Sequence, residues 1–348
     1  MPRFITICLS FSCFFLILTC LPRLIAQEES CLARTIPVTP IDAHGLPLQD
    51  LQASSLQGKV HGRPVAVLSA TLNTLPRRVM VCVDMSGSMW ESESVWPVTQ
   101  MMLEDIAQAG PALGQIGMEL FAEKVFEVVD ISPNPLAMRM KVASLHGANV
   151  EERVPRRERR TALWDALWQA ADQFTPPTSG DVIYALTDGG DNWSHHTVKQ
   201  LEDKLLARGI RVFGFVPTVP LPFRARTPEE ASGLGAMRDI VMTTGGNFIY
   251  LCPDPLDPQC GGLRHYFGEW TTGKPRSVLL AASRELYQQM SVYFDAGIRL
   301  PIVLKKRTEW ELVIADDRGR KRKDIELLYP HRLPPCDGAT LMAPSALN

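Results

Sequence analysis

Residues 79–88 read Val-Met-Val-Cys-Val-Asp-Met-Ser-Gly-Ser. The five apolar residues predict a buried strand, and the first turn after it carries Asp84, Ser86 and Ser88. One carboxylate and two hydroxyls offer only oxygen ligands, which suit Mg²⁺ or Mn²⁺ better than zinc. Taken alone, the turn is compatible with a cation site and equally with an ordinary Ser/Gly-rich connection between a strand and a helix.

The chain on both sides of this strand alternates apolar runs with amphipathic helices. Central strands are predicted at Val79–Val83, Val182–Leu186, Val212–Val216 and Phe248–Leu251, with a strand pair at Ile116–Phe121 and Val125–Ile131. Helices are predicted at residues 98–109, 163–174, 194–208 and 228–244, the first ended by Gly110-Pro111 and the last by Gly245. The predicted fold class is α/β, a doubly wound, mostly parallel sheet flanked by helices. In such sheets ligands bind beyond the carboxyl ends of the strands, where Asp84 is expected.

The composition is that of a folded protein. Of the 348 residues, 45% are hydrophobic, and the formal net charge is -2. The length predicts one large core with a small appended module. The nearly balanced charge excludes a general electrostatic attraction to nucleic acid or to acidic membranes, so partners are expected to be recognised locally.

The first residues have the pattern of a targeting segment. A positive start at Arg3 precedes an almost wholly apolar stretch from Phe4 to Leu21, and the small Ala26 precedes Gln27. This pattern is typical of a signal peptide over residues 1–26 and predicts an exported protein, whether periplasmic, displayed on the cell surface or secreted. The alternative is a retained membrane anchor, because the apolar run approaches the roughly 18 residues that span a bilayer.

An exported chain is expected to form disulfides. Cys82 lies within the apolar strand and is predicted to be a buried free thiol. The other cysteines after residue 26 are predicted to pair as Cys252–Cys260, across a Pro-rich loop, and as Cys31–Cys336, which joins the two ends of the mature chain. The sequence has no cysteine or histidine pairs at zinc-finger spacing, so zinc binding is not expected.

The segments outside the α/β domain, which is assigned to residues 76–251, are expected to form one accessory β module. Residues 27–75 supply short strands. Residues 277–335 supply a helix from Ser277 to Phe294 and a β-hairpin with a charged turn. The remaining assignments are a disulfide-stapled loop at residues 252–276 and a tail at residues 336–348.

Two further segments are expected at the edge that carries Asp84. Thr161 opens the second predicted helix, and Asp188 follows the strand Val182–Leu186 within the sequence Thr-Asp-Gly-Gly-Asp-Asn. Each residue has an ordinary explanation, because Thr is a common helix N-cap and an Asp before Gly is typical of a turn. Their joint appearance at this edge favours a five-oxygen cation site made by Asp84, Ser86, Ser88, Thr161 and Asp188.

This constellation resembles the metal-ion-dependent adhesion site (MIDAS) of von Willebrand factor A domains, where the pattern DxSxS is followed by a Thr and then by an Asp before Gly. The resemblance covers roughly Pro76 to Leu251 and implies that the five residues bind Mg²⁺ or Mn²⁺. Segments 161–167 and 187–192 are similar to those of a bacterial group of exported von Willebrand factor A related proteins. One departure is Arg159-Arg160, which stands where that group often has a Gly pair.

The resemblance implies a connector rather than a catalyst. Two carboxylates and three hydroxyls leave a divalent ion under-coordinated, so an Asp or Glu of a protein partner can complete its shell. No nucleic acid and no small-molecule substrate is expected as a partner, and a membrane only if residues 1–26 are retained. Residues 151–160, with five Arg and three Glu, are either a solvated loop or an attraction for an acidic partner.

Two other functions fit parts of the pattern. Haloacid dehalogenase phosphatases also place an Asp after a first strand and a Gly-rich acidic turn later in the chain. They require a second Asp as general acid, however, where this chain has Ser86, so an enzyme is not expected. The remaining alternative is a structural scaffold with a non-functional metal site.

Overall fold

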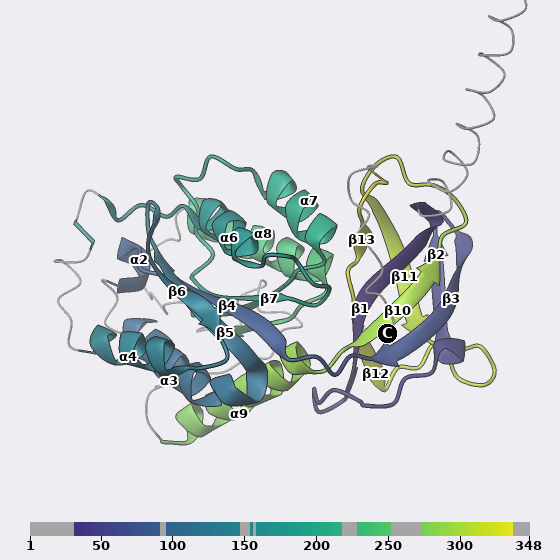
Figure 1. The fold of residues 1–348 in the computed structure, drawn as a ribbon, viewed down its shortest axis with the longest axis horizontal. Coiled ribbons are helices and arrows are strands. Elements are labelled where there is room, and N and C mark those ends of the chain that lie inside the picture. The colour runs from purple at the N-terminus through teal and green to yellow at the C-terminus, as the bar shows by residue number, and fades with distance from the viewer. Residues whose placement is uncertain are drawn as a thin grey trace, which may run out of the picture.

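The computed structural model describes residues 31–90, 95–146, 154–155, 158–217, 228–251 and 273–336. These residues form a six-stranded mixed sheet flanked by helices and, beside it, a second, curled antiparallel sheet (Figure 1). The signal peptide predicted over residues 1–26 and the predicted Cys252–Cys260 pair lie outside the described residues.

The six-stranded sheet is centred on the apolar run Val79–Val83. Its order is β6-β5-β4-β7-β8-β9, and neighbouring strands are parallel except for the antiparallel pair β5 and β6. The bounds of the strands are β4 Arg77–Asp84, β5 Gly114–Phe121, β6 Val125–Ser132, β7 Val182–Leu186, β8 Arg211–Pro217 and β9 Phe248–Leu251. The chain runs outward from β4 to β6 on one side and from β7 to β9 on the other. The order therefore reverses between β4 and β7, which is the position where open α/β sheets bind ligands.

Helices cover both faces of this sheet (Figure 1). Alternate residues of β4 point to opposite faces, so Val79, Val81 and Val83 join one apolar core while Met80 and Cys82 join another. The helices of the first face are α3 Val95–Leu113, α4 Leu136–Leu145 and α9 Gly273–Ser291, and those of the second are α6 Leu163–Gln173, α7 Val198–Arg208 and α8 Pro228–Thr244. Two close-packed cores hold the strand ends in fixed positions.

The first helix continues past its predicted end. α3 runs through Gly110-Pro111 to Leu113. A proline near the end of a helix removes only one amide donor, and the fully buried Leu113 anchors the last turn in the core. The prediction that the helix ends at Gly110-Pro111 was therefore wrong.

Two other helices also differ from the prediction. α7 begins at Val198 rather than at residue 194, because the side chains of Thr197 and Gln200 form a capping box that fixes its first turn. α9 begins at Gly273 and ends at Ser291, since the chain is already extended as strand β10 at residue 294.

The second sheet draws its strands from both parts of the chain outside the α/β core. Its order is β12-β1-β10-β3-β2-β11-β13, and the paired strands are antiparallel. The bounds are β1 Ala33–Asp42, β2 Leu56–Val60, β3 Arg63–Leu72, β10 Phe294–Arg299, β11 Thr308–Ile314, β12 Ile325–Leu328 and β13 Arg332–Leu333. Strands β11 and β12 flank the charged turn but do not form the predicted hairpin, because β11 pairs with β2 and β12 pairs with β1.

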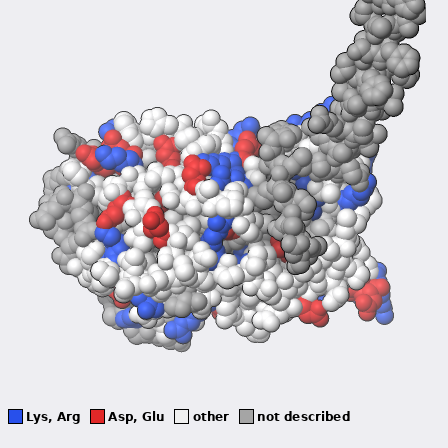
Figure 2. Space-filling model, viewed as in Figure 1, with Lys and Arg blue, Asp and Glu red and all other residues white. Residues whose placement is uncertain are grey.

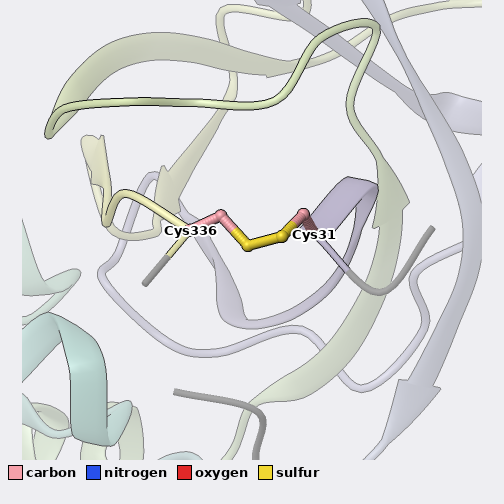
Figure 3. Close-up of a disulfide and its surroundings, with 2 residues drawn as sticks. All are labelled: Cys31 and Cys336. Carbon is pink, nitrogen blue, oxygen red and sulfur yellow. A yellow bond between two sulfur atoms is a disulfide. The ribbon is translucent and has the colours of Figure 1, made fainter. Parts of the chain in front are cut away.

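A disulfide joins Cys31 to Cys336, as predicted (Figure 3). Their Cα atoms lie 5.5 Å apart and are separated by 305 positions in the sequence. The bond joins the first and the last residue of the β module that the structure describes. Because the loop that it closes is long, the bond strongly restricts the unfolded chain. Cys82 is a buried free thiol, which also agrees with the prediction.

The β module meets the core at the amino ends of the core strands (Figure 1). Arg77, at the start of β4, donates to the Ser291 carbonyl at 2.8 Å and lies over the Tyr293 ring. Arg211, at the start of β8, is fully buried and donates to Thr39 Oγ1 of β1 at 3.2 Å and to the Met290 carbonyl of α9 at 2.7 Å. The edge that carries Asp84 is the opposite one, so it faces away from the module.

Acidic and basic side chains are interspersed over the visible face of the molecule (Figure 2). This distribution agrees with the formal net charge of -2. Within the described part of the chain, no helix combines the length and the apolar character that crossing a membrane requires.

Candidate metal centre

The parallel pairing of β4 with β7 brings Asp84 and Asp188 to one edge. Val83 is level with Leu186, so Asp84, the last residue of β4, lies beside Thr187. The Thr187 hydroxyl donates to Asp84 Oδ2 at 2.7 Å. Asp188 is the next residue and is close enough for its charge to act on Asp84.

Asp84 is fully buried, yet no basic side chain among the described residues pairs with it. Its Oδ1 accepts the backbone N–H of Ser86 at 2.9 Å. Burial and the neighbouring charge of Asp188 raise the pKa of Asp84 to about 7, although its hydrogen bonds to Ser86 and Thr187 oppose the shift. A divalent cation would offset both unfavourable terms, so the electrostatics of this edge fit a metal ion.

The two serines of the first turn lie next to this carboxylate. Ser86 is buried and Ser88 is exposed, and their hydroxyl oxygens are 3.2 Å apart at the start of the short helix α2 Gly87–Trp90. The Gly87 amide donates to the Arg159 carbonyl at 3.1 Å. This bond joins the first turn to the segment that ends in Thr161.

Thr161 does not act as the helix cap that its sequence position suggested. Helix α6 begins at Leu163, and its N-cap residue Ala162 makes no side-chain capping bond. The first helical amide, that of Leu163, is instead satisfied by Asp191 Oδ1 at 2.8 Å. The buried Thr161 hydroxyl makes no hydrogen bond to any residue that the structure describes, so it is available as a ligand.

The loop that begins with Asp188 is fastened directly to Thr161. The Thr161 amide donates to Asn192 Oδ1 at 2.9 Å, and the Asn192 amide donates back to the Thr161 carbonyl at 3.0 Å. Asp188 Oδ1 accepts the Gly190 amide at 2.9 Å. The three segments that carry the five predicted ligands are thus linked by hydrogen bonds along one edge of the sheet.

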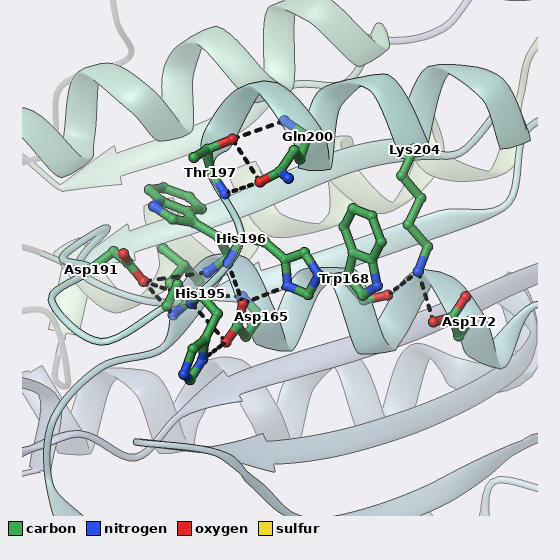
Figure 4. A network of polar contacts seen from close by, with 12 residues as sticks. Asp165, Trp168, Asp172, Asp191, His195, His196, Thr197, Gln200 and Lys204 are labelled. Carbon is green, nitrogen blue, oxygen red and sulfur yellow. Dashed lines mark hydrogen bonds and ion pairs between the residues drawn. The ribbon is translucent and has the colours of Figure 1, made fainter.

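The residues that hold this loop in place were not predicted from the sequence (Figure 4). The carboxylate of Asp165, on α6, accepts the backbone amides and the ring Nδ1 atoms of both His195 and His196, at 2.7–3.0 Å. Burial favours the neutral acid, but these bonds outweigh it and lower the pKa of Asp165 to about 2. The capping box that starts α7 at Thr197 was the available signal, because it places the two histidines in the loop.

The two histidines of this loop differ in their exposure to solvent. His195 is largely exposed, whereas His196 stacks on Trp168 with ring centroids 4.0 Å apart (Figure 4). Lys204 covers the same indole at 3.9 Å and pairs with Asp172 at 2.7 Å. These contacts hold His196, at the end of the loop away from Asp188, against helices α6 and α7. The side chains at the sheet edge are then the five predicted oxygen ligands.

In the described part of the chain, no group of three or more His, Cys, Asp or Glu side chains is placed to hold a metal ion. A cation at this edge therefore depends on hydroxyl oxygens in addition to Asp84 and Asp188. Such a ligand set suits a hard cation of the Mg²⁺ or Mn²⁺ type and is unsuited to zinc, which prefers nitrogen and sulfur.

No protein-family model and no curated protein matches this sequence. Among solved structures, the fold is similar to the conserved hypothetical protein BatB from Bacteroides thetaiotaomicron, with 17% identity over 61% of this chain and 97% of that one, at a TM-score of 0.40. A von Willebrand factor type A protein from Catenulispora acidiphila shares 12% identity over 87% of this chain and 74% of that one, at a TM-score of 0.41. An aerotolerance-related membrane protein from Bacteroides fragilis shares 17% identity over 61% of this chain and 97% of that one, at a TM-score of 0.38. At such identities and scores, none of these likenesses assigns a function to this chain.

Proposed function

We propose that this protein is an exported, non-catalytic binding module that holds a carboxylate of a protein partner through Mg²⁺ or Mn²⁺. The ligands would be Asp84, Ser86, Ser88, Thr161 and Asp188. The observation that carries the proposal is the burial of Asp84 beside Asp188, with no basic side chain pairing with Asp84 among the described residues. Two close carboxylates in such a place need a cation to remain ionised together.

The ligand set also explains why a partner would bind. Five protein ligands, of which three are neutral hydroxyls, would leave the octahedral shell of the ion one position short. Water would fill this position in the free protein, and an Asp or Glu carboxylate of the partner would replace that water. The exposed Ser88 marks the side from which the partner would approach.

A phosphatase is less well supported by the same edge. Position 86, where that mechanism requires a second carboxyl group, carries a serine whose hydroxyl is 3.2 Å from that of Ser88. No contact of the described residues supplies a general acid beside Asp84.

The disulfide supports export. A bond between Cys31 and Cys336 persists in oxidising compartments and is rare in the cytosol. It therefore agrees with the signal peptide that residues 1–26 predict, and with a partner in the cell envelope or outside the cell.

Capture of partners from a cell-envelope extract in the presence of Mg²⁺ tests this function. The wild-type protein should retain a partner that EDTA releases, and Asp84→Ala should retain none. Equal retention by both proteins, or retention that EDTA does not affect, would rule out a metal-held carboxylate. Retention of nothing by a wild-type protein that binds Mg²⁺ would favour the scaffold alternative.

A further inference from the structure

The hydroxyl group of Thr187 connects the two carboxylates of the proposed metal centre, although Thr187 is not one of the five proposed ligands. Thr187 follows β7 and is fully buried. Its Oγ1 donates to Asp84 Oδ2 at 2.7 Å and accepts the backbone amide of Gly189 at 3.0 Å. The amide can only donate and an ionised carboxylate can only accept, so the single hydroxyl proton is directed at Asp84. The same hydroxyl thus orients the Asp84 carboxylate and the turn that carries Asp188.

Thr187 is itself held at a fixed position in the sheet. Its backbone amide donates to the Phe215 carbonyl of β8 at 3.2 Å, while its side chain reaches β4 on the other side. Gly189 has a left-handed backbone, with a φ of 85°, and a Cβ added there would lie 3.3 Å from the Gly233 backbone of α8. The sheet and this helix therefore place the hydroxyl before any ion binds, as expected of a residue that supports a metal ligand.

Both carboxylate oxygens of Asp84 are held by donors of the chain. Oδ1 accepts the Ser86 amide at 2.9 Å, and Oδ2 accepts the Thr187 hydroxyl. These two bonds fix the rotation of the carboxylate and occupy one acceptor position on each oxygen. An ion that binds through a single oxygen leaves both bonds intact. An ion that needs both oxygens of the same carboxylate has to compete with the two donors.

Divalent ions differ in this requirement. Mg²⁺ takes six ligands in a nearly regular octahedron at about 2.1 Å, whereas Ca²⁺ accepts a larger, irregular shell and often binds both oxygens of one carboxylate. The donors on Asp84 are also neutral. They hold the carboxylate in place without supplying the positive charge that a Lys or Arg would bring, so the charge of Asp84 is left for the cation.

We infer that Thr187 is a positioning residue that makes the site select Mg²⁺ or Mn²⁺ over Ca²⁺, because it holds Asp84 for binding through one oxygen. The inference rests on the proposed function, since it requires an ion between Asp84 and Asp188. Without the Thr187 hydroxyl, Oδ2 is freed and the carboxylate can turn. The small ion then loses its fixed ligand, while the larger ion gains access to both oxygens.

Calorimetric titrations of Mg²⁺ and, separately, of Ca²⁺ into the wild-type protein, Thr187→Val and Thr187→Ser test the inference. Valine keeps the shape of the side chain but lacks the hydroxyl, so Mg²⁺ should bind roughly 10- to 100-fold more weakly. Ca²⁺ tolerates an irregular shell and should lose less than about threefold in affinity. Thr187→Ser restores the hydroxyl and should keep most of the wild-type preference for Mg²⁺.

Thr243→Val is the matched control. The buried Thr243 hydroxyl on α8 donates to Glu202 Oε1 at 3.1 Å, so this variant also removes a hydrogen bond between a threonine and a buried carboxylate. Glu202 pairs in addition with Arg332 of β13, at the joint to the β module. Thr243→Val should therefore lose stability as Thr187→Val does, but its affinities for both ions should equal those of the wild type.

The results distinguish the inference from the proposed function. Unchanged Mg²⁺ binding in Thr187→Val, or an equal loss of Mg²⁺ and Ca²⁺ affinity, would overturn the role of Thr187 and leave the proposed function standing. The same holds if Thr187→Ser binds Mg²⁺ as weakly as Thr187→Val. A wild-type protein that binds Ca²⁺ more tightly than Mg²⁺ would overturn the inference even if Thr187→Val does not fold. No Mg²⁺ binding by the folded wild type would overturn the proposed function, and the inference with it.

Discussion

At the amino edge of the core sheet Arg78 and Asp181 compensate each other, whereas at the carboxyl edge Asp84 lies buried beside a second carboxylate. The Arg78–Asp181 pair is bidentate, with nitrogen–oxygen distances of 2.8 and 2.6 Å, and Asp181 is almost completely buried. Asp84 and Asp188 have no such cation among the described residues. The amino edge is electrostatically balanced by side chains of the chain itself, whereas the carboxyl edge would need a bound cation, as we propose, to balance its two carboxylates.

This contrast follows from what each edge must do. A structural joint gains from charges that are matched within the chain, because an unmatched buried charge is costly. A binding edge has to leave one interaction unmade, so that an external ion or partner can make it. The following predictions test whether the two edges differ in this way, in order of decreasing effect.

Removing one partner of the amino-edge pair should produce the largest loss of stability. Asp181→Ala leaves the partly buried Arg78 without its counter-charge and the Thr178 amide without its acceptor, and we expect the free energy of unfolding to fall by roughly 3 kcal/mol. Chemical denaturation measures this change. The control Lys199→Ala breaks an exposed helix pair with Asp203 and should have little effect. Mg²⁺ affinity should be unchanged in both variants, and a large loss in Asp181→Ala would contradict the separation of the two edges.

Mg²⁺ should stabilise the protein through the carboxyl edge alone. Free Mg²⁺ at about 100 times its Kd should raise the free energy of unfolding by about 2.7 kcal/mol. Thermal unfolding with and without the ion measures the gain. Asp181→Ala should gain as much as the wild type, and Asp84→Asn should gain nothing. Stabilisation of Asp84→Asn would place the ion elsewhere.

Mg²⁺ binding should weaken in acid, because protons compete for Asp84. Burial and Asp188 raise its pKa from the ordinary 3.8 to about 7 in the metal-free protein. We therefore expect affinity to fall about tenfold between about pH 8 and about pH 6. The stability of the metal-free protein should change with pH in the opposite direction. A raised carboxyl pKa stabilises the folded state at low pH, and this contribution is lost as the pH rises toward 7. Calorimetric titrations at the two pH values test the prediction, and a pH-independent affinity would contradict it.

The smallest effect is expected from a carboxyl group in the middle of the sheet. Glu119, level with Cys82 across β4 and β5, is fully buried, and its carboxyl group pairs with no basic side chain among the described residues. Burial raises its pKa to about 8, so its stabilising contribution is lost as the pH rises from about 4.5 through 8. Glu119→Gln should flatten this pH dependence and raise the free energy of unfolding by about 1 kcal/mol near neutral pH. The gain comes from removing the ionisable carboxyl group, and the cost of burying an amide offsets most of it. Denaturation across this pH range measures the effect, and Mg²⁺ should not alter it. An unchanged slope would show that Glu119 is compensated.

The local parts of the fold were predictable from the sequence. The apolar run before Asp84 identified the central strand, and the alternation of strands and helices placed Asp84 and Asp188 at one edge, because parallel strands share their carboxyl ends. The Cys31–Cys336 bond followed from counting cysteines after the signal segment. Each of these features depends on short stretches of sequence or on chain direction.

The parts that the sequence did not predict depend on distant contacts. Strand β12 pairs with β1, nearly 300 residues away along the chain, and nothing near the charged turn indicates that partner. The cap of α6 comes from Asp191, a side chain 28 positions away that the sequence did not identify as a cap. The hydrogen bonds between Asp165 and the two histidines His195 and His196 likewise join residues that are distant in the sequence.

Calorimetric titration of Mg²⁺ into the wild-type protein and into Asp84→Asn tests the central claim most directly. Asparagine keeps the shape of the side chain and one oxygen that can accept from the Ser86 amide. Its amide nitrogen replaces the oxygen that Thr187 bonds, and the charge that the metal would neutralise is removed. We expect one Mg²⁺ to bind per wild-type chain and Asp84→Asn to bind the ion at least roughly 100-fold more weakly. Equal binding by the two proteins, or no binding by the wild type, would contradict it.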